Sequence, residues 1–341
     1  MGGRHVPGQH TEVTAAGIAR LAGVGRAAVS NWRRRYDHFP RPIGGTDTSP
    51  TFSLPEIERW LRDQGKLAEI PLRERLWQLI EAHPAGPAEA LARTGDQLLA
   101  HGDRTPTDAD DLAQAAAGLA TELGPAPAYT FLLGRHLDTA ARHLTLTPPE
   151  TAALMAALAG PADTVLDPAC GPGTLLAAAH GPGDTPPGEL YGQDTDSTLT
   201  RLARLRLALR GTATVQTRAG DTLLTDAFPH LTVDAVLCHP PFNERNWGHE
   251  HLTYDPRWEY GLPARTESEL AWVQHSLAKL RPGGTAVLLM PPAAASRRTG
   301  RRVRATLLRR GALRAVIALP AGAAPPHGLP LHLWILRKPG P

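Results

Sequence analysis

Residues 164–174 read Thr-Val-Leu-Asp-Pro-Ala-Cys-Gly-Pro-Gly-Thr, and the fold class can be predicted from this stretch. Its first four residues form an apolar run that ends in Asp167, as a short buried strand does. A Gly-Pro-Gly turn at 171–173 follows, and residues 175–179 are again helix-forming. A strand, a tight glycine turn and a helix N-terminus make a cradle for a nucleotide-like ligand at the carboxyl end of a parallel strand. We therefore expect a ligand site at this edge of a sheet.

Further apolar, strand-like runs follow this stretch, and helical stretches separate most of them. Alternating strands and helices are typical of an open, mostly parallel sheet that is covered by helices. We predict a doubly wound, seven-stranded Rossmann-like α/β domain. The expected strands are 164–167, 190–193, 213–217, 234–238, 285–290, 313–319 and 331–336, and the expected helices include 197–210, 267–280 and 301–309.

Acidic residues follow the first three of these strands. Asp194 lies about 20 residues beyond the glycine turn, where dinucleotide-binding folds place an acid on a ribose. Asp221 follows Gly220 after the third strand. Together with Asp167, these acids suit a ligand that carries a ribose, an adenine and an amino group. On these features alone, NAD fits as well.

The segment His239-Pro240-Pro241-Phe242 follows the fourth expected strand and favours a different chemistry. An adenine N6 lone pair is delocalised into the ring, so two acceptors on its N–H bonds are needed to make the nitrogen nucleophilic. A polar first side chain and the carbonyl of Pro240 supply acceptors, while the two prolines stiffen the loop. Phe242 offers a face on which a flipped-out base can stack. We therefore predict these four residues as catalytic, over the alternative of a rigid turn beside a core phenylalanine.

Taken in order, the motifs resemble those of N6-adenine DNA methyltransferases. More narrowly, they are similar to the modification (M) subunit of type I restriction-modification systems. The resemblance covers roughly residues 144–338 and is specific, because many motifs occur in the right order. It does not extend to the N-terminal segment. The motifs that carry it are Thr147-Pro148-Pro149-Glu150, 167–173, Gly192-Gln193-Asp194, Gly220-Asp221, 239–242, 255–261, 273–284, 316–320 and 328–330.

The resemblance implies S-adenosylmethionine as the cofactor and adenine N6 in double-stranded DNA as the acceptor. It assigns the methionine part to Thr147, Asp167, Ala169, Gly171 and Gly173, the ribose hydroxyls to Asp194 and the adenine amino group to Asp221. The chain ends soon after the last expected strand, without a target-recognition domain. Sequence choice would then come from the N-terminal segment, from a partner specificity subunit, or from neither.

His239 departs from the resembled motif, which has Asn, Asp or Ser at this position. A neutral imidazole accepts one hydrogen bond, whereas an imidazolium only donates and repels a sulfonium. We therefore expect weak or pH-sensitive catalysis that falls away below about pH 6.5, the ordinary pKa of histidine.

The N-terminal residues 1–67 contain a second candidate module. Residues 14–22 and 26–35 have helical patterns around a glycine turn, and a turn-rich piece at 39–46 could form a wing before a third helix that Ser53 begins. This order resembles a winged helix-turn-helix. Its second helix would direct a polar set toward phosphates and base edges, namely Arg26, Ser30, Asn31, Arg33 and Arg34. A helical interaction domain without DNA contact is the alternative.

Residues 68–143 alternate helical stretches with Pro/Gly punctuation and carry no recognisable chemistry. We predict three parts: a helix-turn-helix module at 1–67, a helical linker domain at 68–143 and a methyltransferase domain at 144–341. The acidic run at 108–111 is expected to be a solvated face, and the turn at 181–184 lacks the Lys-Ser/Thr of a phosphate-binding loop.

Composition narrows the class of protein. The net charge is only +3, but the basic residues are mostly arginines that gather at 33–35 and 297–310, which is compatible with a polyanion or with solvated helix faces. The two cysteines, a polar N-terminus and the lack of an apolar run of about 20 residues predict a cytoplasmic protein without membrane contact. No metal site is predicted, because His249-Glu250-His251 lacks an evident third ligand.

The leading prediction is site-specific methylation of adenine N6 in DNA by a restriction-modification protein. Two alternatives belong to other classes. His239 could have ended the chemistry, which would leave a cofactor-binding regulator that acts through its N-terminal module. Methylation of RNA or of a protein amide would share the Pro-Pro-aromatic chemistry.

Overall fold

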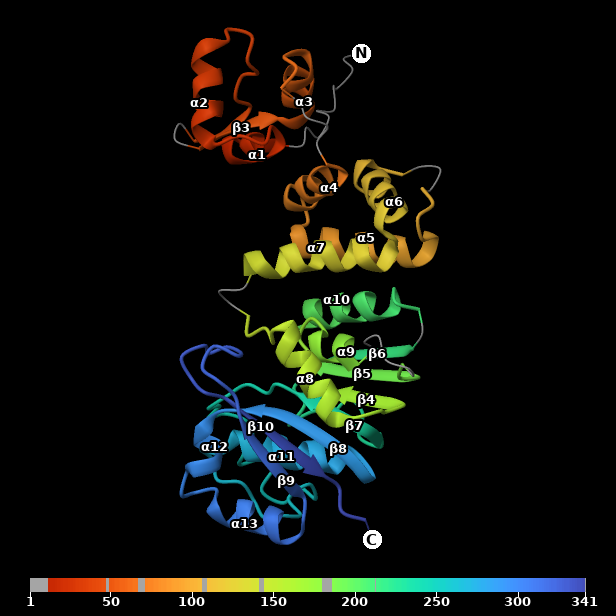
Figure 1. Ribbon diagram of the computed structural model, residues 1–341, viewed down its shortest axis with the longest axis vertical. Coiled ribbons are helices and arrows are strands. Elements are labelled where there is room, and N and C mark those ends of the chain that lie inside the picture. The colour runs from red at the N-terminus through yellow and green to blue at the C-terminus, as the bar shows by residue number, and fades with distance from the viewer. Residues whose placement is uncertain are drawn as a thin grey trace, which may run out of the picture. The chain divides into compact units, whose positions relative to one another are not determined.

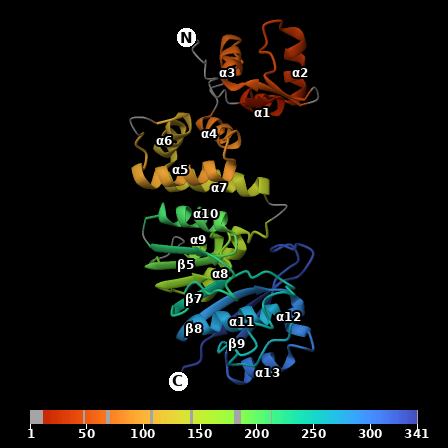
Figure 2. The same ribbon diagram turned by 180° about the vertical axis from the view of Figure 1, so that it is seen from behind.

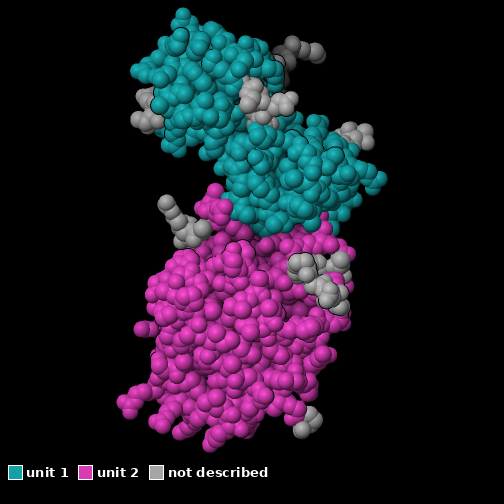
Figure 3. All heavy atoms as spheres, in the orientation of Figure 1, with its two compact units in different colours: residues 1–136 teal, residues 137–341 magenta. Residues whose placement is uncertain are grey.

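The computed structural model describes residues 12–46, 49–66, 71–105, 109–140, 144–179, 186–211 and 213–340. These form two compact units, residues 1–136 and 137–341, which Figure 3 colours separately. The 181–184 turn and Asp108 lie outside the described residues.

Unit 2 is built on one seven-stranded sheet with the order β6-β5-β4-β7-β8-β10-β9. Neighbours from β6 through β8 pair in parallel, and β10 runs antiparallel to both β8 and β9. The strand order reverses between β4 and β7, and in open α/β sheets such a switch point is where ligands bind. The strands are β4 (Thr164–Asp167), β5 (Glu189–Asp194), β6 (Thr214–Ala219), β7 (Val233–Cys238), β8 (Leu280–Met290), β9 (Leu313–Ala318) and β10 (His332–Arg337).

Helices cover both faces of this sheet, because successive strand residues alternate between two cores. Val165 belongs to one core with residues of α8, α9 and α10, whereas Leu166 belongs to the other with residues of α11 and α13. This arrangement confirms the predicted doubly wound α/β fold, which can be followed in Figures 1 and 2. The helices are α8 (Pro149–Ala159), α9 (Thr174–Ala179), α10 (Ser197–Ala208), α11 (Ser268–Lys279), α12 (Pro292–Ser296) and α13 (Arg301–Arg309).

The start of β8 differs most from the prediction. The expected helix 267–280 and strand 285–290 left residues 281–284 unassigned, but β8 already begins at Leu280. Leu280 pairs with Val233 of β7, and the register shifts before Ala235 pairs with Thr285. Residues 281–284 therefore form an irregular part of the parallel pairing between β7 and β8.

The N-terminal part of unit 1 contains two short helices, α1 (Ala15–Leu21) and α2 (Arg26–Arg35), followed by α3 (Leu54–Asp63). A three-stranded antiparallel sheet accompanies them in the order β1-β3-β2. Its strands are β1 (Glu12–Thr14), β2 (Gly44–Thr46) and β3 (Ser49–Ser53). Ser53 is the N-cap residue of α3, but its side chain makes no capping hydrogen bond.

Four more helices belong largely to unit 1: α4 (Leu72–Glu81), α5 (Pro87–His101), α6 (Asp111–Leu123) and α7 (Pro125–Ala140). Glu74 of α4 joins them to the N-terminal part, because it lies 3.5 Å from Arg20 and 2.6 Å from Arg135. The 1–67 segment therefore shares one compact unit with most of the 68–143 segment, up to residue 136, and the three-part division stays a prediction.

Candidate cofactor and target-base site

A cavity of about 660 Å³ lies at the carboxyl ends of the parallel strands of unit 2. It brings together eight of the predicted cofactor and catalytic residues. Those lining it are Ala169, Gly171, Asp194, Asp221, His239, Pro240, Pro241 and Phe242. Three predicted residues are buried behind its wall. Thr147 bonds to His239, Asp167 bonds to Ala169, and Gly173 follows Pro172, which lines the cavity.

The glycine turn after β4 has the backbone shape that the cavity requires. Gly171 and Gly173 have φ angles of +47° and +75°, a region that favours glycine. A Cβ on Gly171 would meet no atom within 4 Å, so its missing side chain leaves space in the cavity. A Cβ on Gly173 would come within 3.1 Å of the Cβ of Ala203 in α10. The first glycine therefore opens the cavity, and the second lets the helix pack closely.

Asp194 at the end of β5 has a structural contact that the sequence did not predict. Its Oδ2 accepts a hydrogen bond from the Gly171 amide at 2.8 Å, and its Oδ1 accepts one from the Asp196 amide at 3.0 Å. The carboxylate thus ties the glycine turn to the next strand. Each carboxylate oxygen can accept more than one hydrogen bond, so Asp194 can still receive a hydroxyl group from the cavity.

Asp221 lies at the cavity wall after β6. Its Oδ1 accepts hydrogen bonds from the amides of Leu223 and Leu224, each at 3.0 Å. Among the described residues, Oδ2 has no hydrogen-bond partner. One oxygen therefore shapes the turn, and the other can accept a hydrogen bond from a ligand.

Asp167 is a buried carboxyl group directly behind the cavity. Its Oδ1 accepts the amide of Ala169 at 3.0 Å. Burial, reinforced by the nearby charge of Asp194, raises the pKa of Asp167 well above its usual range. A cationic ligand in the cavity would favour the ionised form of this group, which fits the ammonium and sulfonium charges of S-adenosylmethionine.

His239 is held by a residue far away in the sequence. Its Nδ1 lies 2.8 Å from the hydroxyl oxygen of Thr147, and the two residues are 92 positions apart. Its Nε2 is buried and has no partner among the described residues. The imidazole ring lies 5.4 Å from the ring of Phe242, which packs at the edge of the α8–α9 core and also lines the cavity.

Burial also changes the charge of this histidine. It lowers the pKa of His239 from 6.5 to about 4. The prediction that His239 becomes charged near pH 6.5 is therefore wrong, because the folded chain removes its ring from water. At neutral pH the imidazole is uncharged, as the predicted chemistry needs.

Five polar residues that the sequence analysis missed also line or brace the cavity. Asn243 has a φ of +58°, and among the described residues it is the one non-glycine residue with a positive φ. Its amide donates to Glu269 at 3.0 Å, and its side chain bonds to Arg297, which also pairs with Glu269 at 2.8 Å. Glu244 lines the cavity as well, and its amide donates to Ser268 at 3.2 Å. The Pro-Pro-Phe loop is thus fastened to the N-terminus of α11.

The 255–261 motif forms a strap beneath the site rather than a part of its wall. The guanidinium of Arg257 bonds to Asp255 at 2.8 Å, to the carbonyl of Leu223 at 2.6 Å and to Nδ1 of His275 at 2.9 Å. Leu223 accepts this bond two residues after Asp221. The motif therefore fixes the turn that carries Asp221.

The structure places the predicted DNA-contacting residues together on helix α2. All five side chains are exposed: Arg26, Ser30, Asn31, Arg33 and Arg34. Arg34 donates to the side chain of Asn31 at 2.6 Å, and the guanidinium of Arg33 lies 5.4 Å from the ring centre of Phe52.

The fold and the cavity together define a class: a Rossmann-like protein with a nucleotide-type site beside a Pro-Pro-Phe loop. Within that class, the chain belongs to the N-6 DNA methylase family, whose model matches residues 125–340. This finding confirms the predicted family. The match begins at residue 125 and does not include the N-terminal helices α1 to α3.

Curated relatives are methylase subunits of type I restriction enzymes. The chain is 27% identical over 205 residues to the HindI methylase subunit of Haemophilus influenzae, covering 56% of this chain and 45% of that protein. It is 29% identical over 190 residues to the MjaIX methylase subunit of Methanocaldococcus jannaschii, covering 52% of this chain and 34% of that protein. The chain thus spans less than half the length of these two relatives.

Solved structures share the fold. A type I restriction-modification methyltransferase subunit from Streptococcus thermophilus matches with a TM-score of 0.57 at 19% identity, over 95% of this chain and 77% of that one. A class I S-adenosylmethionine-dependent methyltransferase from Listeria monocytogenes, described as putative, also matches. The TM-score is 0.60 at 19% identity, over 79% of this chain and 88% of that one. Among the described residues, no helix is long and apolar enough to cross a membrane.

Proposed function

We propose that this chain transfers a methyl group from S-adenosylmethionine to adenine N6 in DNA, as part of a restriction-modification system. One observation carries the proposal. The glycine turn, the acids at successive strand ends and the Pro-Pro-Phe loop line a single cavity at the switch point of the sheet.

The donor part of the cavity fits S-adenosylmethionine, which supplies an electrophilic methyl group when bound. The open face of Gly171 admits the ligand, and Asp194 and the free Oδ2 of Asp221 offer acceptors to its ribose and adenine groups. Asp167 lies behind this turn and compensates the positive charge of the ligand when it ionises.

The acceptor part of the cavity is the Pro-Pro-Phe loop. Phe242 stacks on an extruded base, and the Pro240 carbonyl accepts one N–H of the amino group. Neutral His239 accepts the second N–H through Nε2, provided that Nδ1 donates its proton to the Thr147 hydroxyl. The Thr147 hydroxyl oxygen can accept this proton, so the contact is compatible with the tautomer that the chemistry needs.

Methyl transfer from tritiated S-adenosylmethionine to unmethylated duplex DNA tests this function. We expect label at N6 of adenine, lost in Phe242→Ala while calorimetric cofactor binding remains. Asp221→Ala should instead weaken cofactor binding. Label on RNA or on protein, but not on DNA, would replace the proposed substrate.

A second function is favoured by the burial of His239 Nε2, which has no accessible surface. If the base cannot reach this atom, the chain is a cofactor-binding regulator that binds DNA without methylating it. Cofactor binding without transfer, together with transfer restored by His239→Asn, would establish this second function.

The proposed partners are double-stranded DNA and a specificity subunit, and the proposed location is the cytoplasm. The exposed face of α2 supports DNA contact by unit 1, because Arg33 and Arg34 can pair with phosphates beside Ser30 and Asn31. Alanine at Arg33 and Arg34 should weaken duplex binding at low salt, as measured by fluorescence anisotropy.

A further inference from the structure

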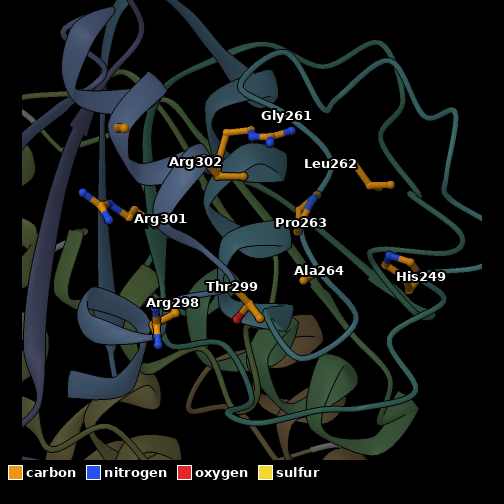
Figure 4. A pocket seen from close by; sticks show the side chains of 11 residues that line it. His249, Gly261, Leu262, Pro263, Ala264, Arg298, Thr299, Arg301 and Arg302 are labelled. Carbon is orange, nitrogen blue, oxygen red and sulfur yellow. The ribbon is translucent and has the colours of Figure 1, made fainter.

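A second cavity of about 670 Å³ in unit 2 is walled by arginines. Figure 4 shows Arg298, Arg301 and Arg302 on one side, with the 261–264 segment and His249 facing them. The arginines come from the turn before α13 and from its first residues, and all three are exposed. Leu262, Pro263, Ala264, Val303 and Ala305 add an apolar lining.

The charge of this cavity is not balanced by acids. None of its lining residues is Asp or Glu, and among the described residues these three guanidinium groups form no ion pair. The nearby acids Glu269 and Glu267 both pair with Arg297 instead, at 2.8 and 3.9 Å. In Figure 4 only Arg302 reaches toward the 261–264 segment, whereas Arg298 and Arg301 point away from it. Three guanidinium groups without an acidic partner, spread along the start of α13, make a site for an extended anion.

One loop lines both the arginine cavity and the proposed base site. Asn246 lines the base site and also a small hollow of about 180 Å³, whose lining includes Arg245, His251 and Arg265. His249 lines that hollow and the arginine cavity as well. Residues 243–251, which directly follow Phe242, therefore connect all three.

A hydrogen bond also ties the arginine cavity to the catalytic loop. Arg297, next to Arg298, bonds to the side chain of Asn243, next to Phe242. An anion held by the arginines would thus be positioned relative to the base site. A nucleic acid strand has this geometry, because its phosphates continue on both sides of an extruded base.

We infer that Arg298, Arg301 and Arg302 bind the phosphodiester backbone of the DNA strand that carries the target base. The guanidinium groups pair with successive phosphates, and the apolar lining at 262–264 contacts the sugars. This inference rests on the proposed function, because it takes the base site as the place where the strand is read. Helix α2 in unit 1 would supply separate contacts.

The test is a salt titration of duplex binding by the full-length chain, followed by fluorescence anisotropy with a labelled DNA. In the triple variant Arg298→Ala/Arg301→Ala/Arg302→Ala, the slope of log affinity against log salt should fall by about 2 to 3, since each phosphate contact contributes about 0.9. Each single variant should bind roughly five- to tenfold more weakly at 0.1 M salt.

Two controls accompany these variants. Arg309→Ala removes an exposed arginine at the far end of the same helix, outside the cavity, and should leave the slope unchanged. The triple Arg→Lys variant keeps the charges and should keep most of the slope. Cofactor binding by calorimetry should be equal in all variants, which confirms that each one is folded.

The outcomes separate this inference from the proposed function. A reduced slope in the triple Ala variant supports the inference even if no methyl is transferred to DNA. An unchanged slope, or no duplex binding by the wild type, overturns it even if methyl transfer occurs. Binding of an acidic protein surface, rather than DNA, by the arginines would also overturn it.

Discussion

His239 shows how far the surroundings of one residue change its chemistry. The imidazole occupies the first position of the Pro-Pro-Phe motif, and burial lowers its pKa to about 4. The ring therefore stays neutral through the range in which a free histidine would gain a proton. Its Nδ1 is occupied by the contact with the Thr147 hydroxyl, which leaves Nε2 as the ring nitrogen without a protein partner among the described residues.

The pH dependence of methyl transfer tests this pKa. We expect the rate constant kcat to stay level from about pH 8 to pH 5 and to fall near pH 4, where the imidazolium forms. His239→Asn should lose that fall. Initial rates at saturating cofactor measure kcat at each pH, and circular dichroism checks that the protein stays folded. A wild-type midpoint near pH 6.5 would contradict the low pKa.

Thr147 is expected to act as a positioning residue for His239. Thr147→Val removes the hydroxyl with little change of volume, so kcat should fall roughly tenfold, as for the loss of one hydrogen bond of about 1.4 kcal/mol. Thr147→Ser keeps the hydroxyl and should retain the rate. In the His239→Asn background, Thr147→Val should have a different effect; equal effects in both backgrounds would show that Thr147 acts elsewhere.

Asp167 should couple cofactor binding to proton release. Its raised pKa favours the protonated form in the free protein, and a bound cation favours ionisation. Calorimetry in buffers of different ionisation enthalpy should therefore detect proton release when the cofactor binds. Asp167→Asn cannot ionise and should bind more weakly without releasing the proton. If wild type and Asp167→Asn release the same number of protons on cofactor binding, Asp167 does not have this role.

At the scale of elements, two loops are held by bonds to the α11 region. The loop after β7 is fastened by Asn243 to Glu269 and Arg297, and the turn after β6 is fastened by Arg257 to the Leu223 carbonyl. Loops that carry binding residues are positioned by the scaffold beneath them. Arg257 therefore acts on the site without touching the cavity.

Replacing Arg257 tests this strap. Arg257→Ala leaves the Asp255 carboxylate and the Leu223 carbonyl without their partner, so the free energy of unfolding should fall by about 3 kcal/mol. Cofactor affinity should also fall, because the Asp221 turn loosens. The control Arg265→Ala breaks an exposed pair with Glu250 at 3.7 Å and an exposed hydrogen bond to the Arg245 carbonyl at 3.5 Å, and should cost about 0.5 kcal/mol or less. Urea unfolding and calorimetry measure both effects.

At the scale of the whole molecule, the described part of unit 2 contains two buried neutral histidines, His239 and His275. Burial lowers the pKa of His275 to about 3, reinforced by the adjacent Arg257, and that of His239 to about 4. Both gain a proton near pH 6.5 once the chain unfolds. The unfolded state therefore binds more protons between these values, and the stability due to these groups is lost as the pH falls from about 6.5.

This linkage predicts the pH dependence of unfolding. Each histidine should contribute about 1.4 kcal/mol per pH unit between pH 6 and pH 5, and the raised pKa of Asp167 contributes with the opposite sign. The difference between wild type and His239→Asn in the slope of the unfolding free energy against pH gives the contribution of His239 alone. Urea midpoints of unit 2, followed by the fluorescence of its buried tryptophans, give the slopes. Parallel slopes for both proteins would contradict a neutral buried His239.

Local pattern in the sequence determined the fold class, the order of the strands in the chain and the family. Strand and helix periodicity, and a glycine turn followed by acids at strand ends, depend on residues close together, so they are visible without a structure. The predicted strand start at residue 285 was wrong because the conformation of residues 280–284 depends on pairing with Val233 of a neighbouring strand.

Only the tertiary structure decided the chemistry of individual groups. Thr147 meets His239 across 92 residues, and burial from several elements sets the charge of that histidine. Arg298, Arg301 and Arg302 looked like a solvated cluster, and only the facing 261–264 segment makes them the wall of a cavity. Charge state and enclosure depend on what the folded chain brings near a group, and residue type alone does not contain that information.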